Sequence, residues 1–243
     1  MYTFDNSPYV REIVDFLSPS NPYRILAIMK GAQLGLSTGF IENGIGWIIS
    51  QQPGNVLCLV GHDDLVEKAM GKIDNMIDTT GIRRLIHSNA NRTKNNKSGD
   101  KDRSKEFTGG HLTLGPTNHK TLRQVSYRYG FIDDFEAMKS DTKESGATVP
   151  LIMQRFSTYA KTMKLAFIST PEVKETSNIE REYLKGDQRK YFVPCPCCGE
   201  YITFEWECDS EFVENGKAGI YKGWLTRCSH WESNRMLTTS RRR

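Results

Sequence analysis

The chain has 243 residues, a length that suits one large domain or one domain with a small appendage. Hydrophobic residues make up 37% and charged residues 26%, which is typical of a globular protein and argues against a disordered or fibrous chain. The net charge is only +4, so overall charge does not by itself indicate a nucleic-acid partner. No run approaches the ~20 apolar residues of a membrane helix. The first residues lack a secretory signal, so we expect a reduced, cytoplasmic protein without disulfides.

Apolar runs that suit buried strands alternate with helical patterns along most of the chain. Strands are predicted at residues 24–29, 55–60, 111–114, 127–132 and 164–169, and helices at 37–49, 63–77 and 149–159. Asp63 or Asp64 is expected to cap the second helix. The alternation predicts an α/β domain over residues 1–190, with a mostly parallel sheet covered by helices on both faces. Cysteines, aromatics and turn residues then predict a small, loop-rich appendage over residues 191–243.

The segment 91–105 is polar and mostly basic, and two interpretations stay open. It is either a solvated loop or a contact with the DNA backbone, in which basic side chains release counterions from phosphates.

The first strand leads into a turn, residues 30–38, that resembles a phosphate-binding loop. Against the pattern G-x-x-x-x-G-K-[ST], Gly35 and Ser37 are in register, but Lys30 replaces the first glycine and Leu36 replaces the lysine. Because such a loop wraps around the phosphates, Lys30 could supply the missing charge from the opposite side, and Ser37 would bind Mg²⁺. An ordinary turn with a solvated Lys30 is the alternative. The residues expected to contact ATP here are Lys30, Gly31, Gln33, Gly35, Ser37 and Thr38.

Acidic residues follow the predicted strand at 127–132. Asp133 is the candidate for the Mg²⁺ side, and Asp134 stands where many ATPases carry a catalytic glutamate. An aspartate is shorter by one methylene, so either Asp134 acts through a water or Glu136 takes part. Alternatively, these acids only cap the next helix.

Hydroxyl residues end the last predicted strand. Ser169 and Thr170 could sense the γ-phosphate, or they form a simple turn before Pro171. In an open parallel sheet, the strands predicted at 24–29, 127–132 and 164–169 would end at the same carboxyl edge, which brings their polar residues together.

The appendage contains a C-x-x-C sequence, whose spacing allows two thiolates to bind one Zn²⁺. A zinc site that begins with Cys195 and Cys198 would be completed by Cys228 and a nearby histidine, His230. The alternative is a metal-free remnant in which the cysteines pack as small apolar residues.

Taken in order, these segments resemble the large terminase subunit of the lambda type, the GpA family of phage packaging proteins. The matching residues are 9–13, 29–35, 122–123, 133–136, 169–171, 177–180 and 187–200, of which the last run is the most specific. The resemblance implies an ASCE-type P-loop ATPase that uses ATP and Mg²⁺ and can place its functional lysine at the start of the loop. Tyr9 falls near the family's adenine-contacting region.

The resemblance also implies a motor that translocates double-stranded DNA into a procapsid in the host cytoplasm. It would work with a small terminase subunit and the portal, and we expect a homo-oligomer and no membrane. Asp134 replaces the family's usual glutamate, which bears on the hydrolysis rate. Such subunits resemble two-part enzymes in which a nuclease domain follows the motor. These 243 residues leave no room for a second domain of that size, so we expect no DNA cleavage by them. The alternative function, favoured by Leu36 and Asp134, is a non-catalytic DNA-binding or assembly module on a degenerate P-loop fold.

Overall fold

The computed structural model describes residues 3–87, 103–116, 125–137, 148–172, 176–194, 199–203, 205–214 and 217–225. The chain divides into two compact units, Met1–Gln188 and Arg189–Arg243. No helix in the described ranges has the length and apolar character needed to cross a membrane.

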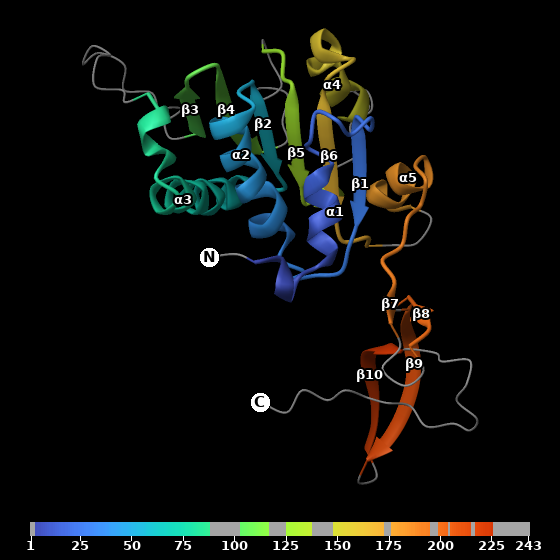
Figure 1. Cartoon of the computed structure of the whole chain (residues 1–243). Coiled ribbons are helices and arrows are strands. Elements are labelled where there is room, and N and C mark those ends of the chain that lie inside the picture. Colours follow the sequence, from blue (N-terminus) through green and yellow to red (C-terminus); the bar gives the residue numbers. More distant parts are fainter. Residues whose placement is uncertain are drawn as a thin grey trace. The chain divides into compact units, whose positions relative to one another are not determined.

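A six-stranded sheet organises the first unit (Figure 1). Its strand order is β1-β6-β5-β2-β4-β3, and the first five of these strands pair in parallel. Strand β3 pairs antiparallel with β4 at one edge. The predicted mostly parallel α/β sheet is therefore confirmed. The strands are β1 (Ile25–Met29), β2 (Val56–Val60), β3 (Ser104–Phe107), β4 (Gly110–Pro116), β5 (Tyr129–Asp133) and β6 (Lys164–Ser169).

Helices cover both faces of this sheet. Successive residues of a strand point to opposite faces, so each buried strand contributes side chains to the packing on both sides. All five residues of β2 are buried. Val56, Cys58 and Val60 belong to one apolar cluster, which includes residues of the first three α-helices, whereas Leu57 and Leu59 belong to a second. The helices of the first cluster are α1 (Tyr9–Asp15), α2 (Asn43–Gln51) and α3 (Asp63–Thr79), and those of the second are α4 (Thr148–Arg155) and α5 (Asn178–Leu184).

Most predicted elements are present, with differences at their boundaries. Strand β6 covers the predicted residues 164–169, whereas the helix predicted at 37–49 is a wide π-helical turn, η2 (Ser37–Glu42), followed by α2. The predicted cap of α3 is wrong, because His62 occupies that position and both aspartates lie in the first turn. Helices α1 and α5 and strand β3 were not predicted. Short 3-10 turns complete the described part of this unit: η1 (Phe4–Asn6), η3 (Ile82–Leu85), η6 (Phe135–Ala137) and η7 (Ser157–Tyr159).

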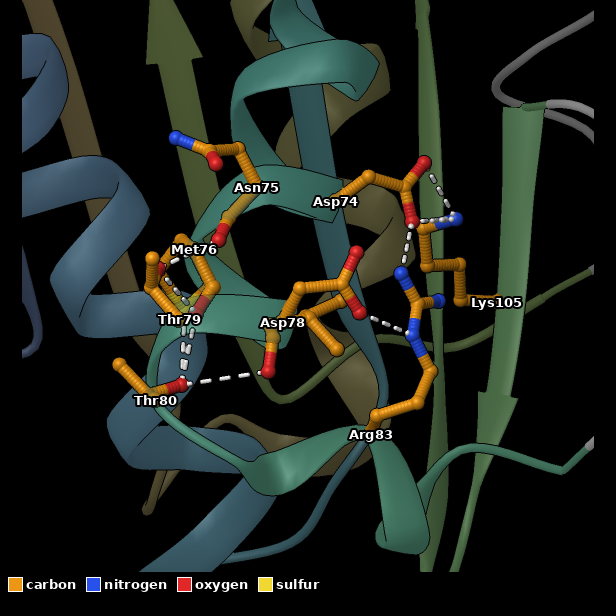
Figure 2. A network of polar contacts seen from close by, with 9 residues as sticks. Asp74, Asn75, Met76, Asp78, Thr79, Thr80, Arg83 and Lys105 are labelled. Carbon is orange, nitrogen blue, oxygen red and sulfur yellow. Dashed lines mark hydrogen bonds and ion pairs between the residues drawn. The ribbon is translucent and has the colours of Figure 1, made fainter.

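Ion pairs connect α3 with β3 and with the residues that follow α3 (Figure 2). Lys105 Nζ lies 2.8 Å from Asp74 Oδ1, and Arg83 bridges Asp74 and Asp78 at 3.1 and 2.7 Å. The hydrogen bond from Arg83 lowers the pKa of Asp78. The interpretation of residues 91–105 as a loop is therefore wrong at its end, since Lys105 belongs to a strand and is paired. Residues 91–102 lie outside the described part of the chain.

The second unit contains two antiparallel strand pairs. Strand β7 (Val193–Pro194) pairs with β8 (Tyr201–Ile202), and β9 (Glu205–Glu214) pairs with β10 (Lys217–Leu225). Two strands of ten and nine residues were not expected from the loop-rich sequence. The proposed zinc ligands Cys195, Cys198 and Cys228 lie outside the described residues.

Candidate active site

Three neighbouring parallel strands bring the predicted site residues to one edge of the sheet. Lys30 follows β1, Ser169 ends β6 and Asp133 ends β5, and β6 lies between the other two strands (Figure 1). The backbone N–H of Lys30 donates to the carbonyl oxygen of Ser169 at 3.0 Å. The start of the turn after β1 is therefore tied directly to the end of the central strand.

Ser37 and Asp133 meet at this edge although 96 positions separate them in the sequence. The Ser37 hydroxyl donates to Asp133 Oδ2 at 3.2 Å. Burial raises the pKa of Asp133, and the neighbouring Asp134 charge raises it further. The Lys30 ammonium, the Ser37 hydroxyl and the backbone N–H of Asp134 act in the opposite direction. The carboxylate is thus partly desolvated, and Lys30 is close enough to stabilise its charge.

The turn between β1 and η2 has the backbone of a tight, exposed loop. Gln33 and Gly35 have φ values of 58° and 72°, in the left-handed region that glycine adopts most easily. Gly35 is exposed, and a methyl group added to it would meet no atom within 4 Å. Thr38 is also exposed, and its hydroxyl donates to Glu42 Oε1 at 3.1 Å.

Leu36, at the position where the standard pattern has lysine, is a core residue. Its exposure is 3%, and it belongs to the apolar cluster shared by the first three α-helices. A side chain at this position points into the core of the domain. The only cationic residue that the sequence offers within this turn is therefore Lys30.

Tyr9, on α1, supports the same loop. Its hydroxyl donates to the carbonyl oxygen of Leu34 at 2.6 Å. The resemblance suggested Tyr9 only as part of a region near the adenine, and the hydrogen bond to the loop was not predicted.

Asp134 has an unusual backbone conformation for a residue other than glycine, with φ of 56°. Its N–H donates to Asp133 Oδ1 at 3.1 Å, which fixes the turn after β5, and its side chain is exposed. The carboxylate lies against Gly61, the residue that follows β2.

Glu136 has different partners from those expected of a catalytic acid. Its carboxylate oxygens accept hydrogen bonds from the Ser177 hydroxyl at 3.0 Å and from the N–H groups of Asn178 and Ile179 at 2.9 and 3.1 Å. Its own N–H donates to Ser169 Oγ at 3.0 Å. Glu136 therefore caps α5, an interaction that favours a carboxylate because the free N–H groups of a helix lie at its N-terminus.

Ser169 is 1% exposed, and both its hydroxyl and its carbonyl are engaged within the fold. Thr170 is exposed next to it. Of the two hydroxyl residues predicted to sense a phosphate, only Thr170 has a side chain exposed to solvent.

A separate hollow of about 450 Å³ lies at the amino ends of the strands, opposite the candidate site. It is lined by residues at the start of β1, on α4 and in the turn before β6.

Residues 1–233 match the protein family described as "Phage terminase large subunit gpA, ATPase domain". The chain belongs to this family. The match extends over nearly the whole sequence and includes the loop at Lys30, the acids at Asp133 and Asp134, and the end of β6.

The fold of this family member is also found in a solved terminase structure. The large terminase of a thermophilic bacteriophage aligns with a TM-score of 0.50 and 13% identity, over 74% of this chain and 41% of that one. This chain thus spans about two fifths of that terminase. The large terminase ATPase domain of Thermus phage P74-26 aligns with a TM-score of 0.46 and 13% identity, over 82% of this chain and 79% of that one. No curated protein is significantly similar in sequence.

Proposed function

We propose that this chain hydrolyses ATP and is the motor domain of a terminase large subunit. The observation that carries the proposal is the convergence of Lys30, Ser37 and Asp133 at the carboxyl ends of neighbouring strands. This is the edge where open parallel sheets bind ligands. Family membership supports the same assignment.

In this assignment the exposed turn from Lys30 to Ser37 holds the phosphates of ATP. Gly35 lets the backbone approach them closely because it carries no side chain. Lys30 supplies the positive charge that a standard P-loop lysine would supply, since Leu36 is buried in the core. Tyr9 holds the loop through its hydrogen bond to Leu34.

Ser37 and Asp133 fit a magnesium site, because both present oxygen atoms, the donors Mg²⁺ prefers, and these atoms lie within 3.2 Å of each other. Bound Mg²⁺ would neutralise the charge that develops on the phosphate oxygens. Burial raises the pKa of Asp133, whereas Lys30, the Ser37 hydroxyl and the backbone N–H of Asp134 favour its ionised, metal-binding form.

We assign the orientation of the attacking water to Asp134 rather than to Glu136. The exposed Asp134 carboxylate would accept the proton of a water whose oxygen attacks the γ-phosphorus, while the bond from phosphorus to the leaving ADP oxygen breaks. Glu136 is engaged by three donors of the segment that begins α5 and acts as a positioning residue.

The family suggests the wider role. Hydrolysis would drive double-stranded DNA into a procapsid, in the host cytoplasm, with a small terminase subunit and the portal as partners and several copies of the chain acting together. We expect double-stranded DNA to raise the ATPase rate of the purified chain. A rate unaffected by DNA would argue against the motor role while leaving hydrolysis intact.

Steady-state ATPase assays with nucleotide binding measured alongside test the site. Asp133→Asn should weaken binding of Mg²⁺·ATP and lower kcat. Asp134→Asn should lower kcat and leave nucleotide affinity within about threefold, because its interaction is made only during the reaction. Asp15→Asn, which changes an exposed aspartate of α1, is the matched control and should change neither. If the wild-type chain binds DNA but hydrolyses no ATP, the non-catalytic module is the better description.

A further inference from the structure

Gly61 lies directly after β2, beside the turn that carries Asp134. Strands β2 and β5 are neighbours in the sheet (Figure 1). Leu59 of β2 lies opposite Ile132 of β5. The φ of Gly61 lies outside the left-handed region, unlike that of Gly35 or Gly81, so φ alone does not require glycine at this position. A glycine at this position therefore needs another explanation.

Space provides that explanation. A methyl group on Gly61 would lie 2.6 Å from Asp134 Oδ2 and 2.9 Å from Cβ of Ala137. Even the weakly attractive contacts between carbon and oxygen have lengths of about 3.3–3.6 Å. The carboxylate of Asp134 thus occupies the volume that a side chain on Gly61 would fill.

The backbone of Asp134 is held by the hydrogen bond from its N–H to Asp133 Oδ1, whereas its side chain is exposed. Oδ2 is the far end of that side chain. Rotation about the side-chain bonds is therefore the least costly way for the carboxylate to leave the surface of Gly61.

We propose that Gly61 is a positioning residue for hydrolysis, which leaves room for the Asp134 carboxylate to lie where it orients the attacking water. This inference rests on the proposed function. It accounts for the short acid at position 134, since the carboxylate already contacts the neighbouring strand end without the additional methylene of glutamate. Gly61→Ala turns the carboxylate away from this place.

The test compares variants of the full chain in ATPase and nucleotide-binding assays, with thermal unfolding to check the fold. Gly61→Ala should lower kcat by about 10- to 100-fold, the effect of displacing a reacting group by about 1 Å. Nucleotide affinity should stay within about twofold, because the phosphate-binding loop is untouched. Gly71→Ala is the control, since a methyl group there meets no atom within 4 Å and the residue is exposed on α3.

Two further variants separate positioning from packing. Gly61→Ala with Ala137→Gly removes the close contact with Cβ of Ala137 and keeps the one with the Asp134 carboxylate, so it should restore stability and not kcat. In the Asp134→Asn background, Gly61→Ala should cause no further loss of kcat, because both changes remove the same interaction.

The outcomes are distinct from those that test hydrolysis itself. A wild-type chain without ATPase activity refutes the proposed function. With an active wild type, unchanged kcat in a folded Gly61→Ala variant overturns the positioning role. The positioning role is also overturned if the loss of kcat from Gly61→Ala adds to that from Asp134→Asn. The same holds if that loss disappears when Ala137→Gly is added. If neither Gly61→Ala variant folds, the contact is not relieved by rotation of the carboxylate, and the inference is also wrong.

Discussion

Replacing Leu36 with alanine tests whether this position serves the core rather than the nucleotide. Leu36 is 3% exposed within the larger apolar cluster. Removing a buried leucine side chain costs about 2–5 kcal/mol, from lost burial and from the cavity left behind. A loss of about 3 kcal/mol corresponds to a fall in Tm of about 6–12 °C for a domain of this size.

Denaturant unfolding and the ATPase rate of the folded fraction are the two measurements. Leu184→Ala is a matched control, because Leu184 is 56% exposed, and it should cost less than about 0.5 kcal/mol. The kcat of folded Leu36→Ala, measured well below its Tm, should stay within about threefold of wild type. A variant that keeps its stability and loses its turnover would refute this reasoning and place Leu36 in the catalytic machinery.

Three further substitutions have defined outcomes. Asp133→Asn should raise the Tm of the magnesium-free protein at neutral pH while lowering kcat. The raised pKa of Asp133 favours its protonated form in the fold, and the stability gained at low pH is lost as the pH rises through that pKa; a lower Tm would contradict this. Glu136→Gln should destabilise the domain by about 1–3 kcal/mol, because one donor of the α5 cap loses its acceptor. A collapse of kcat in folded Glu136→Gln would instead make Glu136 the water-orienting acid. Gly130→Ala should cost about 1–3 kcal/mol in denaturant unfolding, since its methyl group would lie 2.5 Å from Phe156 and 2.6 Å from Leu165; an unchanged midpoint would show that these side chains repack freely.

Buried parallel strands could be predicted from sequence because each is a short apolar run between polar turns. Strand β6 matches its predicted residues, and the five-residue runs of β1 and β2 lie within theirs. The polar ends of parallel strands meet at one edge of the sheet, so Lys30, Asp133 and Ser169 could be grouped from the sequence alone.

The missed elements are those whose stability depends on distant partners. Helices α1 and α5 have only seven residues each and contain several charged side chains, so they carry no strong helical pattern. Strand β3 has the polar sequence Ser-Lys-Glu-Phe, and its pairing with β4 and the Lys105–Asp74 contact become visible only in three dimensions.

Roles within the site were harder to predict than its location. Glu136 is two residues from Asp134 in sequence, yet its carboxylate points to α5 while that of Asp134 lies on Gly61. Asp134 has a left-handed φ, and the sequence carries no signal for it. Gly61 was not among the predicted site residues.

The central claim is that Lys30 serves the phosphates in place of the standard P-loop lysine. The most direct measurement is the steady-state ATPase rate and ATP affinity of Lys30→Ala, with thermal unfolding measured on the same sample. Lys30 is half-buried at the start of an exposed loop, so the variant should keep its fold. Loss of a phosphate-binding charge should lower kcat/KM by about 100-fold or more. A folded Lys30→Ala variant that hydrolyses ATP at the wild-type rate would contradict the account.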